Sequence, residues 1–357
     1  MDENTITKTG KIFTKFQHID QFRQIYSFFK SRAQYLGKDE NNNPIYDPNI
    51  IPEPKTFYGT VKIHGTNASV CERSDIRWFQ SRNNLIDIGN DNAGFANFAR
   101  QNQEAFDNIF NKIYSEFGKE ENKRYCIFGE WFGKTIQNGV AVSQLSKRYA
   151  IFDVIIRDDN NEYEFHAPKE FIKTLLDPEH DIYNVFLFKT YEITVDFEKP
   201  AGLLTDNLSQ LTLEVEQRCP VGEYFGVDGI GEGIVWNYRE DDGSTVHRFK
   251  TKGEKHSSSK VKSVKNLVSI TPEEFEGIEK FVDYSLTENR LNQGLQEVFP
   301  DGNINQKGIG KFIGWCVGDV MREEADTICK NKFKPQIVVN TLQNKARKFI
   351  IDKLNQL

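Results

Sequence analysis

The sequence has few cysteines and places them far apart. Five occur among 357 residues, at positions 71, 126, 219, 316 and 329, and no two form a C-x-x-C pair. This spacing excludes a disulfide framework and the usual structural zinc sites, and it favours a reducing, intracellular compartment. The sequence also has no run of 18 apolar residues and no apolar core of signal-peptide length near its start. We therefore expect a soluble, unprocessed monomer that does not enter membranes.

An excess of positive charge is also missing. The 46 Lys and Arg are outnumbered by 52 Asp and Glu, so the chain cannot coat nucleic acid through its net charge of −6. Residues 248–265 are the exception, with seven basic residues against the single acid Glu254. Within them Arg248, Lys250 and Lys252 would share one face of a strand, and paired lysines on one face suit a phosphate chain. A solvated charged surface is the alternative interpretation of this segment.

The hydrophobic pattern predicts an α+β domain of antiparallel sheets with flanking helices, followed by a small all-helical domain. Helices are expected over 18–34 and about 91–117, and strands over 56–62, 67–73, 76–82, 124–133, 148–158, 232–240 and 244–252. A capping box at 271–274 begins three or four further helices that continue to Leu357. The boundary falls within 262–270, which gives domains of residues 1–265 and 266–357.

One segment points to covalent chemistry: Lys62-Ile63-His64-Gly65-Thr66-Asn67, a lysine at the end of a strand followed by a glycine-centred turn. A lysine is a nucleophile only as the neutral amine, so nearby positive charge or burial must lower its pKa. Lys250 and Lys252 are candidates to supply that charge. As an isolated K-x-x-G, however, the segment matches by chance more often than not.

Further segments follow in a fixed order. They are Ser81-Arg82-Asn83, then Phe128-Gly129-Glu130-Trp131-Phe132-Gly133, then Tyr149-Ala150-Ile151-Phe152-Asp153, then Glu232-Gly233-Ile234-Val235-Trp236, and then Phe249-Lys250-Thr251-Lys252. The series resembles the six signature motifs of the covalent nucleotidyltransferases, the superfamily of polynucleotide ligases and RNA capping enzymes. The K-I-H-G-T-N form resembles the phage nick-sealing RNA ligases (RNA ligase 2 type) and the kinetoplastid RNA-editing ligases. The helical tail, which contains Thr287-Glu288-Asn289-Arg290-Leu291-Asn292, is similar in character to the C-terminal domain of that family.

The resemblance implies a nucleotidyltransferase domain over 1–265, an RNA-docking helical domain over 266–357, and an ATP-dependent RNA ligase. Such an enzyme forms a lysyl-AMP, passes the AMP to an RNA 5′-phosphate and joins that end to a 3′-OH, here at a nick in a duplex. The implied roles are Lys62 as nucleophile, His64 beside the phosphates, Arg82 and Glu130 at the ribose, Phe152 on the adenine, Glu232 at Mg²⁺ or Mn²⁺, and Lys250 and Lys252 at the phosphates. Thr66 and Asn67 would lie near the 3′-OH, and Lys255, Lys260 and Lys262 would contact RNA. Relatives commonly carry glutamate where this chain has Val61, which leaves backbone groups at Val61 to recognise adenine.

Several alternatives remain open at this point. Taken singly, Glu130 and Glu232 would be strand-end carboxylates, Phe152 a core residue and Arg82 half of a surface ion pair. A DNA ligase or a GTP-using capping enzyme would share the motifs, although both usually append a small β-barrel where this tail reads as helical. A non-catalytic RNA-binding relative is the remaining alternative, and the intact Lys62, Glu130 and Glu232 argue against it.

Overall fold

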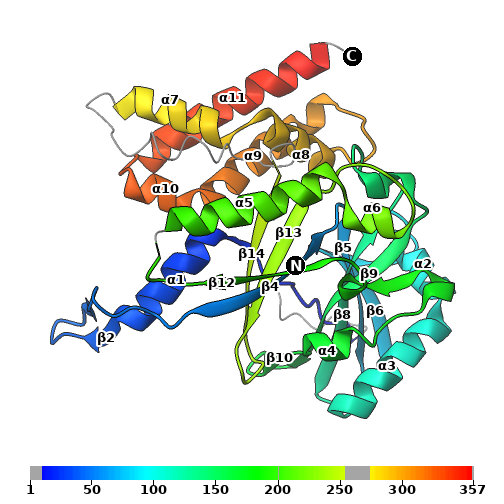
Figure 1. The fold of residues 1–357 in the computed structure, drawn as a ribbon. Coiled ribbons are helices and arrows are strands. Elements are labelled where there is room, and N and C mark those ends of the chain that lie inside the picture. The colour runs from blue at the N-terminus through cyan, green and yellow to red at the C-terminus, as the bar shows by residue number, and fades with distance from the viewer. Residues whose placement is uncertain (1–9, 200, 254–273, 356–357) are drawn as a thin grey trace. The chain divides into compact units, whose positions relative to one another are not determined.

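The chain divides into two compact units, Met1–Gly253 and Glu254–Leu357 (Figure 1). The computed structural model describes residues 10–199, 201–253 and 274–355. Sheets and helices build the first unit, and the described part of the second consists of helices, so the predicted α+β class is confirmed. The predicted boundary between residues 265 and 266 and the first three residues of the predicted capping box lie outside the described residues.

A five-stranded sheet carries most of the predicted motifs. Its order is β1-β14-β13-β4-β12, with β1 parallel to β14 and the other pairs antiparallel. Its strands are β1 (Asp20–Gln21), β4 (Lys55–Lys62), β12 (Thr190–Val195), β13 (Gly233–Arg239) and β14 (Val246–Lys252). In β12 the buried Tyr191, Ile193 and Val195 alternate with exposed residues, which is the two-residue period of a half-buried strand. The arrangement places β4, which ends at Lys62, between β13 and β12.

A seven-stranded sheet forms the other half of the unit. Its order is β10-β9-β8-β5-β6-β7, and β11 pairs with β9 in parallel. Its strands are β5 (Thr66–Arg73), β6 (Ile76–Ser81), β7 (Leu85–Ile86), β8 (Lys123–Phe132), β9 (Arg148–Asp158), β10 (Glu164–His166) and β11 (Ile182–Asn184). A separate two-stranded sheet pairs β2 (Tyr35–Lys38) with β3 (Pro44–Tyr46). The seven predicted strands are confirmed within one or two residues at their ends.

The helices of the first unit depart from the sequence predictions in several places, including the helix predicted over 18–34, which begins at Phe22. They are α1 (Phe22–Gln34), α2 (Phe95–Gln101), α3 (Gln103–Phe117), α4 (Lys169–Ile172), α5 (Ala201–Gln217) and α6 (Pro220–Tyr224). The single helix predicted over 91–117 is wrong, because it breaks at Asn102, whose side-chain amide donates to the carbonyl of Phe98 at 3.0 Å. Helices α4, α5 and α6 were not predicted, and α5 packs on β13 and β14 (Figure 1). None of the described helices is long and apolar enough to cross a bilayer.

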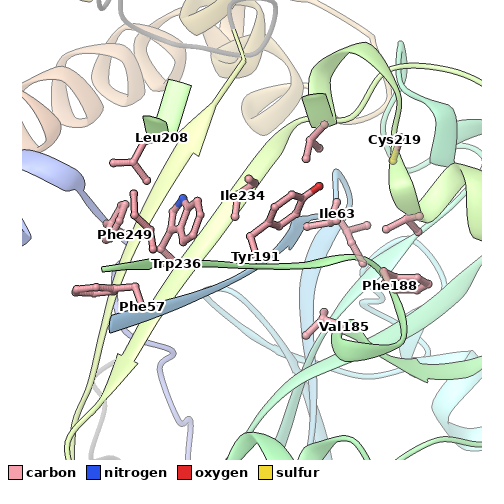
Figure 2. Close-up of a cluster of buried hydrophobic side chains, with 14 of the residues drawn as sticks. Phe57, Ile63, Val185, Phe188, Tyr191, Leu208, Cys219, Ile234, Trp236 and Phe249 are labelled. Carbon is pink, nitrogen blue, oxygen red and sulfur yellow. The ribbon is translucent and has the colours of Figure 1, made fainter. Parts of the chain in front are cut away.

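Three hydrophobic clusters hold the first unit together. One packs the five-stranded sheet under α1 and α5, and Figure 2 shows Trp236 beside Phe249 within it; their rings stack with centroids 6.0 Å apart. A second packs α2 and α3 on one face of the seven-stranded sheet, and a third, around Phe128, covers the opposite face. These clusters together hold most of the buried apolar side chains of the first unit.

The second unit has its own core. Its described helices are α7 (Glu274–Ser285), α8 (Glu288–Val298), α9 (Ile309–Glu323), α10 (Ala325–Lys330) and α11 (Pro335–Asn355), five where three or four were predicted. Thr287 caps α8 by accepting from the backbone N–H of Arg290. The Arg290 side chain is fully buried, where it pairs with Asp319 at 3.1 Å and Glu323 at 2.9 Å. A buried arginine with two carboxylate partners fixes how α8 meets α9.

Candidate active site

Three predicted segments that are distant in sequence meet at one end of the five-stranded sheet. Gly233, the first residue of β13, pairs with Lys62 at the end of β4 and with Lys252 at the end of β14. A Cβ on Gly233 would lie 2.0 Å from the carbonyl oxygen of Thr251, so the close approach of these strands requires glycine. The residue before it, Glu232, is thereby placed between two lysines.

The Glu232 carboxylate is the centre of this group, which we call the Glu232 cluster: Lys62, His64, Glu232 and Lys252. Its Oε2 accepts from Lys62 Nζ at 2.8 Å and lies 3.0 Å from His64 Nδ1, while its Oε1 lies 3.1 Å from Lys252 Nζ. Only 3% of the Glu232 side chain is exposed, against 21% of Lys62. A buried carboxylate with opposite charges on both oxygens stays ionised. Although burial opposes ionisation, Lys62, Lys252 and His64 hold the pKa of Glu232 well below its usual value.

The same contacts act in the opposite direction on Lys62. Burial favours the neutral amine, but Glu232 and, more weakly, Glu130 outweigh it and raise the pKa of Lys62 above its usual value. The prediction that Lys250 and Lys252 lower this pKa is therefore wrong for this arrangement. Lys252 is itself bound to the carboxylate, so its charge is largely compensated there. While Glu232 binds it, the Lys62 amine stays protonated, and loss of this counter-charge would favour the neutral amine.

Glu130 reaches the cluster from the other sheet. It lies in β8, and its Oε1 accepts from the backbone N–H of Gly65 at 3.0 Å. A Cβ at Gly65 would lie 2.3 Å from the carbonyl oxygen of Trp131, which explains the glycine three residues after Lys62. Burial, with a smaller contribution from Glu232, raises the pKa of Glu130 to about 7, although Lys62 acts in the opposite sense.

Phe152 stands at an irregularity in β9. Phe128 in β8 pairs with Asp153 and the next residue, Gly129, pairs with Ile151, so Phe152 is the extra residue of a β-bulge. Its ring is partly exposed and meets Phe16 edge-on at 5.0 Å. A bulge re-aims a side chain, and Phe152 packs against the hydrophobic cluster of the five-stranded sheet as well as against the one around Phe128.

Arg82 follows β6 and comes within electrostatic range of both Lys62 and Glu130. Its guanidinium lies 6.0 Å from the Phe16 ring centre and donates to the carbonyl of Gln17 at 3.3 Å. Arg82 is thus held near the predicted site by Phe16 and Gln17 of the N-terminal segment. The sequence did not indicate that this segment contributes to the site.

Thr66 and Asn67 begin β5, one turn beyond His64. Asn92, from the loop before α2, donates to Thr66 Oγ1 at 3.1 Å and to the Asn67 carbonyl at 3.4 Å. The side-chain oxygen of Asn67 is buried and has no hydrogen-bond partner among the described residues. A buried acceptor without a donor marks a place where a ligand could bind.

Other predicted residues fall into three groups. Val61 is 3% exposed and faces the hydrophobic cluster, so only its backbone could contact a nucleotide. Lys250 is partly buried two residues before Lys252 on the same face of β14. Lys255, Lys260 and Lys262 lie outside the described residues.

Arg248 corrects the interpretation of the basic segment. It was predicted to belong to a phosphate-binding face, but only 6% of its side chain is exposed and it forms an ion pair with Asp153 at 2.5 Å. It is not available to a phosphate chain.

Metal-binding side chains are sparse in the described part of the chain, which holds no cluster of three or more His, Cys, Asp or Glu arranged for an ion. Mg²⁺ in phosphoryl-transfer sites is commonly held by one or two carboxylates together with substrate phosphates and water. Glu232 fits that pattern. Its oxygens bind the ammonium groups of Lys62 and Lys252, which a metal ion would displace. A cavity of about 400 Å³ lies elsewhere, beside α2, with Phe98, Trp131 and Lys147 in its lining.

The family of the chain follows from the segment that holds these residues. A protein-family model described as RNA ligase matches residues 55–252. The chain belongs to the RNA ligase family. The matched span runs from the start of β4 to Lys252, so all members of the Glu232 cluster, with Arg82, Glu130 and Phe152, lie inside the part that defines the family.

Individual relatives are distant. No curated protein is significantly similar to the chain. An RNA ligase of Naegleria gruberi with PPi is 17% identical, with a TM-score of 0.41, over 68% of this chain and 56% of that one. Mutants of that ligase with ATP and Mn, and with AMP and Mn, are both 15% identical with TM-scores of 0.40 and 0.41; they cover 66% and 67% of this chain and 55% and 56% of theirs. The chain spans little more than half the length of these structures, and membership in the RNA ligase family rests on the family match.

The raised pKa of Glu130 predicts that this residue makes the free energy of unfolding depend on pH, and that Glu130→Gln removes this contribution. The folded-state pKa, about 7, lies above the ordinary value of 4.5, so the folded protein holds this proton more tightly than the unfolded chain. The resulting stabilisation is complete below the ordinary pKa and is lost as pH rises through about 7, by at most about 3 kcal/mol. Glu130→Gln should therefore gain stability relative to wild type between about pH 5 and about pH 8.

Urea unfolding at both pH values measures this difference. Glu104→Gln, at an exposed position of α3, is the matched control and should follow wild type. A Glu130→Gln protein whose free energy of unfolding changes with pH as wild type does would contradict the assignment.

Proposed function

We propose that this chain is an ATP-dependent RNA ligase that works through a lysyl-AMP intermediate. The observation that carries the proposal is the Glu232 cluster: a lysine at a strand end, held by a buried carboxylate beside a second lysine, within the segment that matches the RNA ligase family. A lysine is a strong nucleophile once its proton is removed, and a second cation beside it suits a phosphate substrate.

The proposed first step transfers AMP to the protein. Lys62 Nζ attacks the α-phosphorus of ATP, a P–N bond forms, and the bond to the pyrophosphate oxygen breaks as pyrophosphate leaves. An oxygen of the RNA 5′-phosphate then displaces the lysine and takes the AMP. Finally the 3′-OH attacks the phosphorus of the RNA 5′-phosphate, a phosphodiester bond forms between the two RNA ends, and the bond from that phosphorus to AMP breaks as AMP leaves. Each step is an in-line phosphoryl transfer, in which positioning and charge neutralisation do most of the catalysis.

The side chains around Lys62 suit these steps. Lys252 and Lys250 would neutralise phosphate charge, and His64 would lie beside the leaving pyrophosphate. Glu130 and Arg82 would hold the ribose hydroxyls, and the partly exposed ring of Phe152 would stack on the adenine. Glu232 would be the protein ligand of Mg²⁺ or Mn²⁺, which would supply further neutralisation of the triphosphate.

Activation of the nucleophile follows from the same geometry. With Glu232 as its counter-charge, Lys62 is kept as the ammonium. A ligand that engages the Glu232 carboxylate removes that counter-charge, and burial then favours the neutral amine. The attack would thus be coupled to substrate binding. Without substrate, the Lys62 amine would stay protonated and unreactive.

The RNA would approach along the start of β5. Thr66 and the unpartnered Asn67 oxygen lie one turn beyond His64, where a 3′-OH end would be held. Lys255, Lys260 and Lys262, with the helical domain of residues 266–357, would dock a nicked duplex having 5′-phosphate and 3′-OH ends. Contacts of this kind to the sugar-phosphate backbone favour A-form geometry and weaken with salt.

Covalent labelling tests the first step. Incubation with α-labelled ATP and Mg²⁺, followed by denaturing electrophoresis, should mark the chain, and labelled GTP should not. Lys62→Ala should abolish the label, and Lys252→Ala should reduce it by about a hundredfold or more, because each removes a group at the transferred phosphate. Lys55→Ala, at the other end of β4, should label as wild type does. A label that persists in Lys62→Ala would show that another residue is the nucleophile.

Strand joining tests the substrate. We predict that the protein seals a nick whose 3′-OH strand is RNA faster than the same nick in DNA, and that sealing weakens steeply between about 50 and about 200 mM salt. Equal rates on both nicks would contradict the RNA assignment, and labelling without sealing of any nick would indicate a capping-type transferase.

A further inference from the structure

The bulge at Phe152 turns two neighbouring residues to the same side of the seven-stranded sheet. Before it, Tyr149 and Ile151 pack under α2 and α3, and after it Val154 and Ile156 do so. The one-residue shift leaves both Phe152 and Asp153 on the opposite face, toward the five-stranded sheet. In a regular strand these two side chains would point in opposite directions.

Asp153 uses this direction to bind the other sheet. Its Oδ2 accepts from Arg248 Nη2 at 2.5 Å, and Arg248 Nε donates to Asn237 Oδ1 at 3.0 Å. Arg248 lies in β14, two residues from Lys250 on the same face, about 7 Å along the strand. The ion pair thus connects the neighbour of Phe152 to the strand that carries Lys250 and Lys252.

His166 joins the hairpin of β13 and β14 to the same point. Its Nδ1 lies 2.7 Å from Asp153 Oδ2, its backbone N–H donates to the Gly243 carbonyl at 3.0 Å, and its own carbonyl accepts from Arg239 Nε at 3.2 Å. Its Nε2 lies 3.1 Å from Glu164 Oε1, and the ring is 1% exposed. One residue therefore bonds to β9, to its own strand β10 and to the hairpin.

Stability alone accounts poorly for such a group. Replacing a buried ion pair by apolar residues is often neutral or stabilising. Nη1 of Arg248 is moreover buried without a hydrogen-bond partner in the described part of the chain, which opposes stability. Buried charges of this kind are better suited to fixing a register than to holding a fold together.

We propose that Asp153, Arg248 and His166 are positioning residues, which lock the bulge of β9 so that Phe152 faces the base of the nucleotide while Lys250 faces its phosphates. The proposal rests on the proposed function and extends it to three residues that do not touch the nucleotide. If the contacts among Asp153, Arg248 and His166 are weakened, β9 can lose its bulge or shift its register. The Phe152 ring then moves away from the base. Stacking on a base far from the reacting phosphorus contributes equally to the ground state and the transition state. Its loss therefore weakens ATP binding more than it slows the attack by Lys62.

The test is the rate of self-adenylylation in single turnovers as a function of ATP concentration. Arg248→Lys keeps the charge but loses the fork that reaches both Asp153 and Asn237, and His166→Gln removes one ring nitrogen contact. For each variant we expect the half-saturating ATP concentration to rise about tenfold, with the maximal rate within about threefold of wild type. Arg124→Lys is the matched control: Arg124 is also fully buried in the first unit, but it bonds to Thr14 and to the Asp158 carbonyl instead. It should leave the ATP dependence unchanged.

A double substitution separates positioning from general loosening. Phe152→Leu should raise the half-saturating concentration by itself, and adding Arg248→Lys or His166→Gln should raise it little further, because both act through the same ring. Unchanged ATP dependence, additive effects with Phe152→Leu, or a fall in maximal rate alone would overturn the proposal. If Arg248→Lys and His166→Gln both fail to fold while Arg124→Lys folds, the proposal is also overturned. The three residues would then serve stability rather than positioning. A wild-type chain that takes no label from ATP would instead reject the proposed function.

Discussion

The Glu232 carboxylate connects the parts of the site more than any other group does. It lies immediately before β13, almost fully buried, and binds Lys62 through one oxygen and Lys252 through the other. Its negative charge offsets the repulsion between the two lysines that it binds. The pairing of β4, β13 and β14 places the three residues together, so the strand register and the charge pairing agree at this end of the sheet.

The second constraint is the meeting of the two sheets. Lys62, Lys252 and Glu232 come from the five-stranded sheet, whereas Glu130 and Phe152 come from the seven-stranded one. Contacts between them include the Gly65 N–H to Glu130 and the buried pair of Arg248 with Asp153. A nucleotide bound between the sheets would contact both, so the relative position of the sheets would decide how well its base and its phosphates are held together.

Ordered motifs let the sequence predict candidate site residues, because this chemistry depends on a fixed series of short segments. Lys62 ends β4, Glu130 lies in β8 and Glu232 directly precedes β13, and the structure brings these three residues close enough for their charges to interact. The direction of the Lys62 pKa was not foreseen, because the decisive contact with Glu232 spans 170 residues.

Other features had no local signal. The stretch Tyr149-Ala150-Ile151-Phe152-Asp153 reads as an uninterrupted strand, and only its register against β8 reveals the bulge. Arg248 looked like one more member of a basic segment, since its partner Asp153 lies 95 residues away. Helix α5 and the break at Asn102 likewise depend on packing and on one side-chain hydrogen bond rather than on sequence periodicity.

The most direct test of this account is the pKa of Lys62 itself. It can be read from the pH dependence of the Lys62 Cε chemical shift in protein labelled with carbon-13 lysine, assigned by comparison with Lys62→Arg. The account predicts a pKa above that of an ordinary lysine in the wild-type protein without ATP, and a lower pKa in Glu232→Gln, where the counter-charge is gone. A Lys62 amine that is already neutral near pH 7 in the wild-type protein, or a pKa that Glu232→Gln leaves unchanged, would contradict it.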